Sequence, residues 1–480
     1  MIKKINDIKF SIIFLSFGIL IFGWQCFCSG FDLLPGDNID SRFINYILEH
    51  FRLWMLQVEP HKSFWDMPCL YPAKNTLAYS DVLLGIGVIY VPIRFFANEF
   101  HSFLITVFIL CFLNFSTFYF LLKKCFNYKY LASAVGAFFF AFSIIRYGHM
   151  IHVQLLSQFY TILAIICFIK SKKYAGLSFL GCIFAALQLY TSIYMGWFFG
   201  FAVIIFTLIL LFFSDFRNNI FQYAKNNYIY IISNIIFFCL LISPLAIHYL
   251  SVGITKYSFE HVLSLTPNFK DYIINNGFFD NLIIFKQQNF DFDLVYGIGI
   301  LTNILVIYGI FKFNKYKFPL ILFVVLIVAL INIQPLYKLI YNYVPGAGAI
   351  RAVGRYINIL CPVYALIIAN FVNGLNKQAL KWCIVAIIVL EQIPAQSLFK
   401  WSAAETQNEI NKYKIPQTCS VIFLDYSNIP SENNFLLDKI EMDGVWIALK
   451  NHVYTVNGYP TIPMKRISFK LSPECIIELK

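Results

Sequence analysis

Long, largely uncharged apolar runs separated by short polar segments dominate this chain. About eleven of these runs approach the 20 or so residues that a helix needs to cross the hydrocarbon core of a bilayer, where it must satisfy its own backbone hydrogen bonds. The predicted spans are approximately 10–28, 103–122, 130–147, 152–169, 174–190, 195–213, 228–250, 294–311, 318–337, 353–373 and 380–398. The pattern predicts an all-α polytopic membrane protein with about 11 transmembrane helices.

Two of the runs need a closer interpretation. The stretch 174–213 carries no charge and is about two membrane thicknesses long, but Thr191, Ser192 and Gly196 interrupt it, so it predicts a helical hairpin. The first run has a basic flank, a long apolar core and no small-x-small cleavage site after it. We therefore expect an uncleaved membrane anchor rather than a secretory signal.

The segment 81–96 decides the topology. It is apolar but short, and it contains Pro92 and Arg94. If it does not span the membrane, sixteen lysines and arginines fall in short gaps on the same side, as the positive-inside rule requires. We therefore expect a re-entrant or interfacial helix here, capped by Ser80 or Asp81.

This threading places the amino terminus in the cytoplasm and four longer segments outside, 29–102, 251–293, 338–352 and 399–480. In the last segment charged residues return, and short β-rich runs at 419–424 and 453–456 stand between turn residues. We expect residues 1–398 to form the transmembrane domain and 399–480 a small soluble α+β domain outside the cytoplasm.

Composition supports the membrane assignment. The chain is 59% hydrophobic and only 13% charged. Its net charge of +12 indicates no nucleic-acid partner, because the basic residues cluster beside the apolar runs. Most of the twelve cysteines lie in or near apolar runs, whereas Cys69, Cys419 and Cys475 could pair outside; a Cys419–Cys475 bridge is one option that spacing alone does not fix.

Candidate chemistry begins in the first outer segment. Asp37 and Asp40 precede an amphipathic helix that should lie on the outer leaflet. The apolar face of this helix is formed by Phe43, Ile47, Phe51 and Trp54. The two aspartates either cap the helix or form a carboxylate pair that binds a divalent cation or takes a proton from an acceptor hydroxyl. Spacing alone does not choose between these roles.

Further candidates follow along the chain. Tyr79 and Asp81 close an aromatic-rich stretch that is either a membrane-interface belt or part of a sugar site. His149 and His152, with Gln154, stand at the outer end of the third run. Two histidines three residues apart could ligate a metal on one helix face, although interfacial hydrogen bonding is the commoner role.

Two arginines on the predicted outer side break the positive-inside bias. Arg351 and Arg355 are one helical turn apart in the segment before the tenth span. They could clamp a phosphate presented at the outer leaflet. The alternatives are lipid-headgroup binding or a salt bridge to the first-loop carboxylates.

The order of these features resembles the GT-C superfamily of integral-membrane glycosyltransferases. The resemblance is nearest to a bacterial group that includes YfhO-like membrane proteins, and it rests on five short segments. They are Pro35-Gly36-Asp37, Tyr79-Ser80-Asp81, Gly148-His149, Ile350-Arg351 with Gly354-Arg355, and Val456-Asn457-Gly458-Tyr459. The chain has no Trp-Trp-Asp signature of the kind found in oligosaccharyltransferases.

The resemblance implies a glycosyltransferase of the bacterial cytoplasmic (inner) membrane. Its activity would move a sugar from a polyprenyl-phosphate carrier to a glycan or lipid acceptor on the outer face. The catalytic base or metal ligand of the superfamily maps to Asp37, with Asp40 second, and a divalent cation is the one cofactor this implies.

Two other functions remain open. A transporter or lipid-linked glycan flippase also needs many spans, but ion-coupled transporters place charges near the middle of the bilayer. The spans here are expected to hold neutral polar residues such as Gln25, Asn114, Gln188 and Asn234. A non-catalytic envelope assembly factor would use the C-terminal segment as a binding module.

Overall fold

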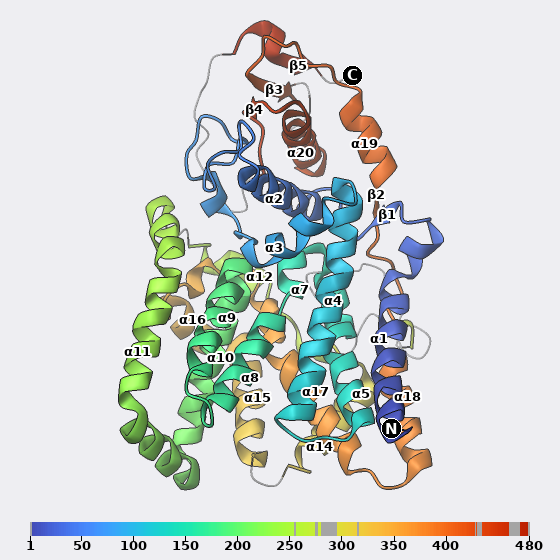
Figure 1. The fold of residues 1–480 in the computed structure, drawn as a ribbon, viewed down its shortest axis with the longest axis vertical. Helices are drawn as coiled ribbons and strands as arrows, with labels where there is room; N and C mark the ends of the chain where they lie inside the picture. Colours follow the sequence, from blue (N-terminus) through green and yellow to red (C-terminus); the bar gives the residue numbers. More distant parts are fainter. Residues whose placement is uncertain are drawn as a thin grey trace.

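The computed structural model describes residues 2–253, 256–273, 277–279, 295–313, 316–427, 429, 434–459 and 471–478. A long helical bundle is capped at one end by the segment between the first two spans, here called the first loop (29–98), and by the C-terminal segment (399–480) (Figure 1). The N-terminus lies at the opposite end of the bundle from the C-terminus.

The helices of the bundle follow the apolar runs. They are α1 (Ile2–Cys28), α4 (Glu99–Lys124), α5 (Tyr130–Phe142), α6 (Ile144–Gly148), η2 (His149–Ile151), α7 (Val153–Leu156), α8 (Phe159–Ser171), α9 (Leu177–Thr191), α10 (Ile193–Leu211), α11 (Ser214–Val252), α12 (Phe259–Ser264), η3 (Phe269–Tyr272), α14 (Ile300–Ile310), α15 (Lys317–Asn332), α16 (Gln334–Tyr343), η5 (Ala347–Ala349), η6 (Val353–Tyr356), α17 (Ile357–Gly374) and α18 (Gln378–Glu391).

Seven helical stretches of the described chain are long and apolar enough to cross a membrane, or eight if the bent pair α15 and α16 is one span. The protein is therefore a multi-pass membrane protein, but the predicted count of eleven is not confirmed. Three of the predicted spans correspond to the shorter helices α9, α14 and α18, which have 15, 11 and 14 residues. The predicted hairpin is confirmed, since α9 and α10 meet at Ser192.

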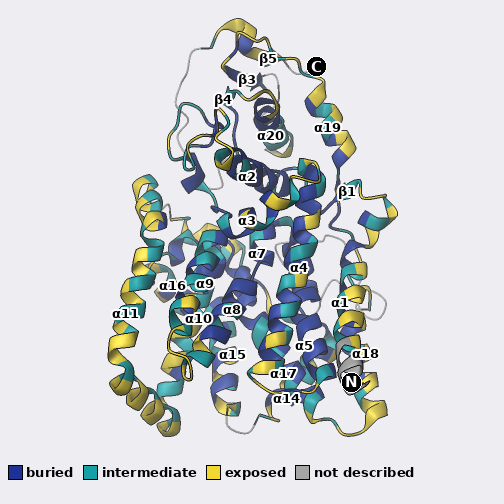
Figure 2. Ribbon diagram, viewed as in Figure 1, coloured by how far each residue is buried: buried dark blue, intermediate teal, exposed yellow. Residues whose placement is uncertain are grey.

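Helices in the centre of the bundle are more deeply buried than helices at its edge. The span that contains α5 is wholly buried, whereas α11 is only 6% buried and lies at the periphery (Figure 2). Gly136 of α5 permits a close approach to α17, because a Cβ atom there would come within 2.7 Å of the Ala369 Cβ. The exposed side chains of α11 are largely apolar, as expected of a helix that faces lipid.

Two buried charges in the bundle were missed by the sequence interpretation, which expected only neutral polar groups in the spans. Arg146 is fully buried and donates to the Phe140 carbonyl at 3.1 Å and to Asn358 Oδ1 at 3.1 Å. Glu391 accepts hydrogen bonds from the backbone amides of Leu301 and Thr302 at 2.9 and 2.7 Å. Both charges hold helices together through fixed hydrogen bonds.

The first loop forms β1 (Leu33–Leu34), α2 (Asp40–Met55), η1 (Thr76–Tyr79) and α3 (Leu84–Ile93). The amphipathic helix predicted after Asp40 is confirmed as α2, but its polar face does not lie open on a leaflet. Arg42, Asn45 and Glu49 of that face are buried. Helix α2 packs between the bundle and α20 (Asn434–Asn451). Arg42 contacts Asp443 of α20, whereas Glu49 contacts Tyr90 and Arg94 of the first loop.

The C-terminal segment alternates strands and helices, as its composition predicted. It contains β2 (Trp401–Ser402), α19 (Ala403–Asn411), β3 (Val421–Asp425), α20, β4 (Tyr454–Thr455), η7 (Pro473–Cys475) and β5 (Ile476–Glu478). The parallel sheet has the order β4-β3-β5, and β2 pairs antiparallel with β1 of the first loop. The two segments that cap the bundle are thus joined by backbone pairing.

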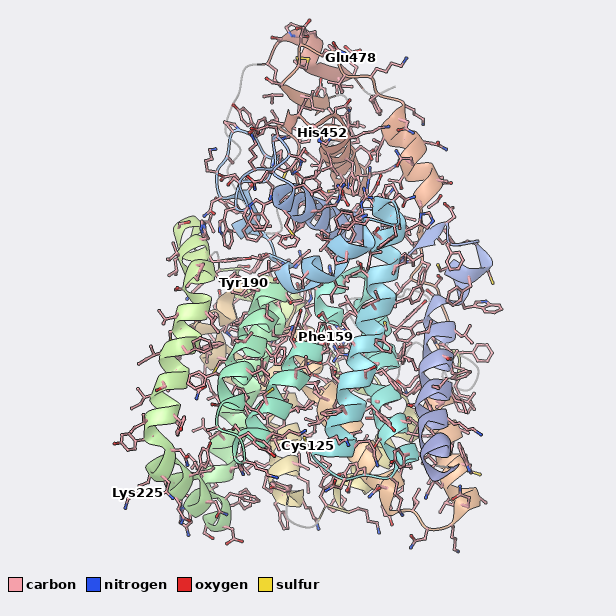
Figure 3. The ribbon with its side chains drawn as sticks, in the orientation of Figure 1. Cys125, Phe159, Tyr190, Lys225, His452 and Glu478 are labelled. Carbon is pink, nitrogen blue, oxygen red and sulfur yellow. A yellow bond between two sulfur atoms is a disulfide. The ribbon has the colours of Figure 1, made fainter. Side chains whose placement is uncertain are left out.

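Four labelled residues show which segments form the two ends of the molecule. His452 and Glu478 mark the end formed by the C-terminal segment, whereas Cys125 and Lys225 lie toward the other end of the bundle (Figure 3). The predicted outer segment 251–293 lies partly outside the described residues.

Candidate functional site

A cavity of about 420 Å³ lies where the first loop, the bundle and the C-terminal segment meet. Six of the nine residues that the sequence singled out line it, although they are up to about three hundred positions apart in the chain. They are Asp40, Asp81, His152, Gln154, Arg351 and Arg355. The remaining three, Asp37, Tyr79 and His149, are not among its lining residues.

Asp37 and Asp40 have different surroundings. Asp37 Oδ1 accepts the backbone N–H groups of Ile39 and Ser41 at 3.1 and 3.2 Å, so this carboxylate caps the start of α2. Asp40 faces the cavity, and its Oδ2 lies 4.0 Å from His152 Nδ1. The capping role weighed for the pair therefore fits Asp37, and the chemical role fits Asp40.

The turn before α2 is fixed by Gly36, which has a φ of +85°. A Cβ atom at this position would lie 1.7 Å from Ser41 Oγ, so no other residue fits without a rearrangement. Burial raises the pKa of Asp37, and the negative charge of Asp40 adds to this shift, while the two backbone hydrogen bonds oppose it. The geometry of the aspartate pair thus depends on the Pro-Gly turn.

Asp81 is the central acidic group of the cavity. It does not cap α3, as the sequence predicted, because α3 begins after Leu83 without a side-chain cap. Its Oδ1 accepts the backbone N–H of Ile193 at 2.8 Å, at the start of α10. Burial raises the pKa of Asp81 to about 6, against the lowering effects of that hydrogen bond and of Arg355, Gln154 and His152.

The two arginines lie on the cavity wall close to Asp81. Arg355 is only 5% exposed and belongs to η6, and its guanidinium lies 5.4 Å from the centroid of the Tyr194 ring. Arg351 precedes η6 in extended backbone, so the two side chains do not stand on one regular helix. Both nevertheless face the same cavity, as a phosphate clamp would require.

The two histidines do not share a helix face. His149 belongs to η2, and its Nδ1 lies 2.7 Å from the Ile145 carbonyl oxygen. His152 follows the end of η2 and turns toward Asp40. The structure therefore does not bring the two histidines together as a metal-binding pair.

Much of the remaining wall is apolar and comes from α9, α10 and α11. It includes Leu189, Ile193, Trp197, Ile242, Leu245 and Tyr249. The cavity end of α11 is held against the first loop, because the His248 ring stacks on Trp65 with centroids 3.9 Å apart and the Tyr249 hydroxyl donates to the Ser80 carbonyl. A charged end and an apolar wall suit a ligand with an anionic head and a lipid tail.

Three residues of the C-terminal segment near this site were not singled out. Tyr459 lines the cavity, and Asp438 is close enough for the Asp40 charge to add to the effect of burial in raising its pKa. The pKa of Lys400 is lowered by burial and raised by the nearby Asp37 carboxylate. Only Tyr459 had a signal in the sequence, because it ends the Val456–Tyr459 segment that carried part of the family resemblance.

A second cavity, of about 390 Å³, lies between α2, α4, α19 and α20. Its two carboxylates are already paired, since Arg94 contacts Glu49 at 2.5 Å and Glu99 at 3.1 Å. None of the candidate residues from the sequence lines it. The cavity beside Asp40 is therefore the better candidate site.

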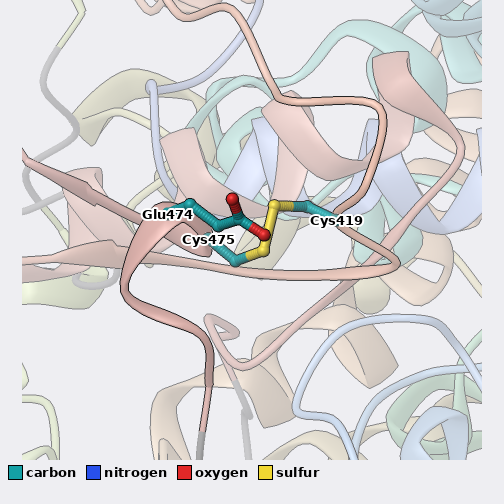
Figure 4. A group of neighbouring side chains, drawn as sticks. All are labelled: Cys419, Glu474 and Cys475. Atoms are coloured by element: carbon teal, nitrogen blue, oxygen red, sulfur yellow. A yellow bond between two sulfur atoms is a disulfide. The ribbon is translucent and has the colours of Figure 1, made fainter.

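The described residues contain one group of three potential metal ligands with atoms within 4.8 Å of one another, namely Cys419, Glu474 and Cys475 (Figure 4). The two cysteines form a disulfide, which confirms the bridge considered from the sequence and removes both thiolates as ligands. Asp37 and Asp40 are not part of such a group. A cation at the aspartate pair stays a prediction.

No family model matches this chain, and no curated protein matches it in sequence. Its fold is similar to that of the oligosaccharyltransferase AglB from Archaeoglobus fulgidus, solved in complex with an inhibitory peptide and a dolichol-phosphate. The TM-score is 0.50 at 12% identity, and the match covers 95% of this chain but only 64% of AglB. At this identity the likeness shows the fold alone, so the chain is a multi-pass membrane protein whose fold is similar to that of AglB.

Proposed function

We propose that this protein is a membrane glycosyltransferase that moves a sugar from a polyprenyl-phosphate carrier to a glycan or lipid acceptor of the cell envelope. The observation that carries the proposal is the single cavity in which Asp40 and two arginines share a wall with apolar residues of three helices. The dolichol-phosphate in the AglB complex supports a lipid-linked donor.

The cavity residues divide the reaction between them. Arg351 and Arg355 bind the phosphate of the donor and stabilise the negative charge that grows on it as the sugar leaves. The lipid tail packs along α9, α10 and α11, whose peripheral member α11 borders the bilayer. The carrier therefore needs no pocket that encloses its whole length.

Asp40 serves as the general base. It takes the proton from an acceptor hydroxyl while the hydroxyl oxygen bonds to the anomeric carbon of the sugar. The bond between that carbon and the phosphate oxygen breaks, and the polyprenyl phosphate leaves with the electron pair. We assign the base to Asp40 rather than Asp37, since the Asp37 carboxylate caps α2.

The finer assignments belong to the same proposal. Residues 1–398 form the membrane domain of a bacterial cytoplasmic-membrane protein, and 399–480 form a soluble domain on the outer face, where the acceptor is found. The nearest relatives are expected among YfhO-like proteins. The aspartate pair could also bind a divalent cation, in which case EDTA would abolish transfer and Mg²⁺ or Mn²⁺ would restore it.

A flippase is less well supported. The buried charges of the bundle, Arg146 and Glu391, hold helices together through hydrogen bonds and do not line the candidate cavity. The apolar wall alone would suit lipid passage, but a carboxylate and two arginines in the lining of the same cavity favour chemistry. A non-catalytic assembly factor would need neither the carboxylate nor the arginines.

The test is transfer by the purified protein reconstituted in liposomes, with radiolabelled polyprenyl-phosphate sugars and extracted envelope acceptors. We expect Asp40→Asn to lower the rate by about 100-fold or more, because general-base catalysis contributes on this order. Asp37→Asn should act more mildly, since an amide oxygen still accepts the capping hydrogen bonds.

Asp215→Asn is the matched control. Asp215 is an exposed carboxylate in the first turn of α11, outside the cavity, and its loss should leave the rate unchanged. A parent protein without transfer, or Asp40→Asn with the parent's rate, contradicts the proposed function. Activity that survives Asp40→Asn but requires residues 399–480 would favour the assembly factor.

A further inference from the structure

The start of α10 is held at a fixed point beside the cavity. Asp81 Oδ1 accepts the backbone N–H of Ile193 at 2.8 Å. Ser192 Oγ accepts the backbone N–H of Met195 at 3.4 Å and so caps the helix. Tyr194, the second residue of α10, therefore enters the cavity lining at a defined position.

The segment 344–356, here called the arginine segment, joins α16 to α17 and carries Arg351 and Arg355. Its backbone is extended at Ile350 and Ala352, and both of these side chains are buried. Since successive side chains of extended backbone point to opposite sides, Arg351 faces away from that packing and into the cavity, which it lines. The direction of Arg351 therefore depends on the course of the backbone around it.

Tyr194 contacts the arginine segment at two points. Its hydroxyl donates a hydrogen bond to the Ala349 carbonyl at 3.1 Å, two residues before Arg351. The Arg355 guanidinium lies 5.4 Å from the centroid of its ring, which is within the range of a cation–π interaction. One side chain thus contacts both the backbone that orients Arg351 and the charged group of Arg355.

Trp197, one turn further along α10, anchors the same segment at its two ends. Its indole N–H donates to the Pro345 carbonyl at 2.8 Å. Its ring packs edge-on against the ring of Tyr356, with centroids 5.7 Å apart. Helix α10 therefore holds the arginine segment at both ends through Trp197 and between them through Tyr194.

We propose that Tyr194 is a positioning residue for the phosphate-binding arginines. Its hydroxyl fixes the backbone from which Arg351 reaches the cavity, and its ring holds the Arg355 guanidinium. Arginines that are already in place lose less conformational freedom when they bind a phosphate, so the affinity is higher. This inference rests on the proposed role of the two arginines in binding the donor phosphate.

The test measures binding and needs no acceptor. The probe is the methyl ester of a polyprenyl phosphate, titrated into the full-length protein in detergent at pH 7.5 and followed by fluorescence quenching. Tyr194→Phe, which loses only the hydroxyl, should raise the Kd about 3- to 10-fold, the usual effect of one lost hydrogen bond. Tyr194→Leu also loses the ring, so its Kd should rise about 10- to 100-fold.

Tyr190→Phe is the matched control. Tyr190 lies near the end of α9 (Figure 3), and its hydroxyl donates to the Leu241 carbonyl of α11, also at 3.1 Å. This tyrosine does not line the cavity. Each of the two Tyr→Phe variants loses one hydrogen bond to a backbone carbonyl, so their melting temperatures should fall by similar amounts. Only Tyr194→Phe should weaken binding of the probe.

A double-mutant cycle tests whether the hydroxyl acts through Arg351. In the Arg351→Gln protein, the further change Tyr194→Phe should alter the Kd by less than about 2-fold, because the group that the hydroxyl positions is gone. A loss of binding that came from general destabilisation would be the same in both backgrounds.

The outcomes distinguish the two claims. If Arg351→Gln weakens binding but Tyr194→Phe keeps the parent's Kd, the inference is overturned and the proposed donor site stands. Equal weakening by Tyr194→Phe and Tyr190→Phe, or an undiminished effect of Tyr194→Phe in the Arg351→Gln protein, also overturns the inference, because the tyrosine is then structural. A parent protein that binds the probe no more tightly than Arg351→Gln overturns both.

Discussion

Asp81 makes the charge of the candidate cavity depend on pH. It faces Arg355 and His152, and burial raises its pKa to about 6. Above that pH it is ionised and offsets part of the positive potential that would attract a phosphate. Below it the carboxyl is neutral and no longer offsets the positive potential that the arginines exert on an anionic ligand.

Binding of a phosphodiester should therefore tighten as the pH falls through 6. A polyprenyl phosphodiester keeps a single negative charge over this range, so changes in affinity report on the protein. We expect its Kd to be about 10-fold lower near pH 5 than near pH 7.5, the effect of removing one charge at several ångströms in a partly screened site. Fluorescence quenching of the detergent-solubilised protein would measure it.

In Asp81→Asn the affinity should stay high and lose its pH dependence. The amide oxygen still accepts the Ile193 N–H, so the start of α10 keeps its cap. Asp215→Asn, which changes a carboxylate far from the cavity, should keep the parent's pH response. A response that persists in Asp81→Asn would show that Asp81 is not its source.

At the scale of residues, the charged residues that line the cavity were easier to predict from the sequence than the contacts formed by tertiary packing. Asp40, Asp81, Arg351 and Arg355 were recognisable because charged residues on the predicted outer side of an apolar chain need a reason. Tyr459 was not, because its place beside Asp40 in the cavity lining comes from the packing of α20 and β3 against the first loop. No periodicity in the sequence records such a contact.

Helix α2 is the element that links the bundle to the C-terminal segment. Its fully buried Arg42 contacts Asp443 of α20 at 2.5 Å and lies 5.8 Å from the centroid of the Trp446 ring. A buried cation is tolerated only while its partner remains. The relative position of α2 and α20, and with it the site, depends on this pair.

Removing the Asp443 carboxylate should destabilise the protein. Asp443→Ala leaves the Arg42 charge buried and unpaired, so the free energy of unfolding should fall by about 3–5 kcal/mol. Lys439→Ala on the same helix breaks a half-exposed pair with Glu409 and should cost less than about 1 kcal/mol. Thermal unfolding in detergent compares them, and equal losses would show that α2 and α20 are not held by the buried pair.

At the scale of elements, the sequence prediction was wrong where a helix packs against other parts of the protein instead of against lipid or water. The amphipathic pattern of α2 predicted a helix with one solvent-exposed face, but Arg42, Asn45 and Glu49 of that face are buried. Asp443 of α20 contacts Arg42, and Tyr90 and Arg94 of the first loop contact Glu49. Helices α14 and α18 are shorter than a span although their sequences read as continuous apolar runs. Glu391, at the end of α18, is used to cap α14, which an apolar-run count cannot anticipate.

At the scale of the whole molecule, the basic gaps and the candidate cavity lie at different ends. Cys125 follows the lysines at the end of α4, and Lys225 belongs to α11; both lie far from His452 of the C-terminal segment. Positive residues concentrate on the cytoplasmic side of membrane proteins. The cavity, the first loop and the C-terminal segment should therefore face the outside together.

Cysteine labelling in intact cells tests this arrangement. In a background without free cysteines, Glu405→Cys on α19 should react with an impermeant maleimide, whereas Lys129→Cys should react only after the membrane is permeabilised. Both positions are exposed, so access depends on the membrane and not on burial. Labelling of both from the same side would contradict the topology, and labelling of Lys129→Cys alone would place the cavity in the cytoplasm. In that case an envelope acceptor could not reach Asp40, and the cavity would have to bind the polyprenyl-phosphate donor from the inner leaflet.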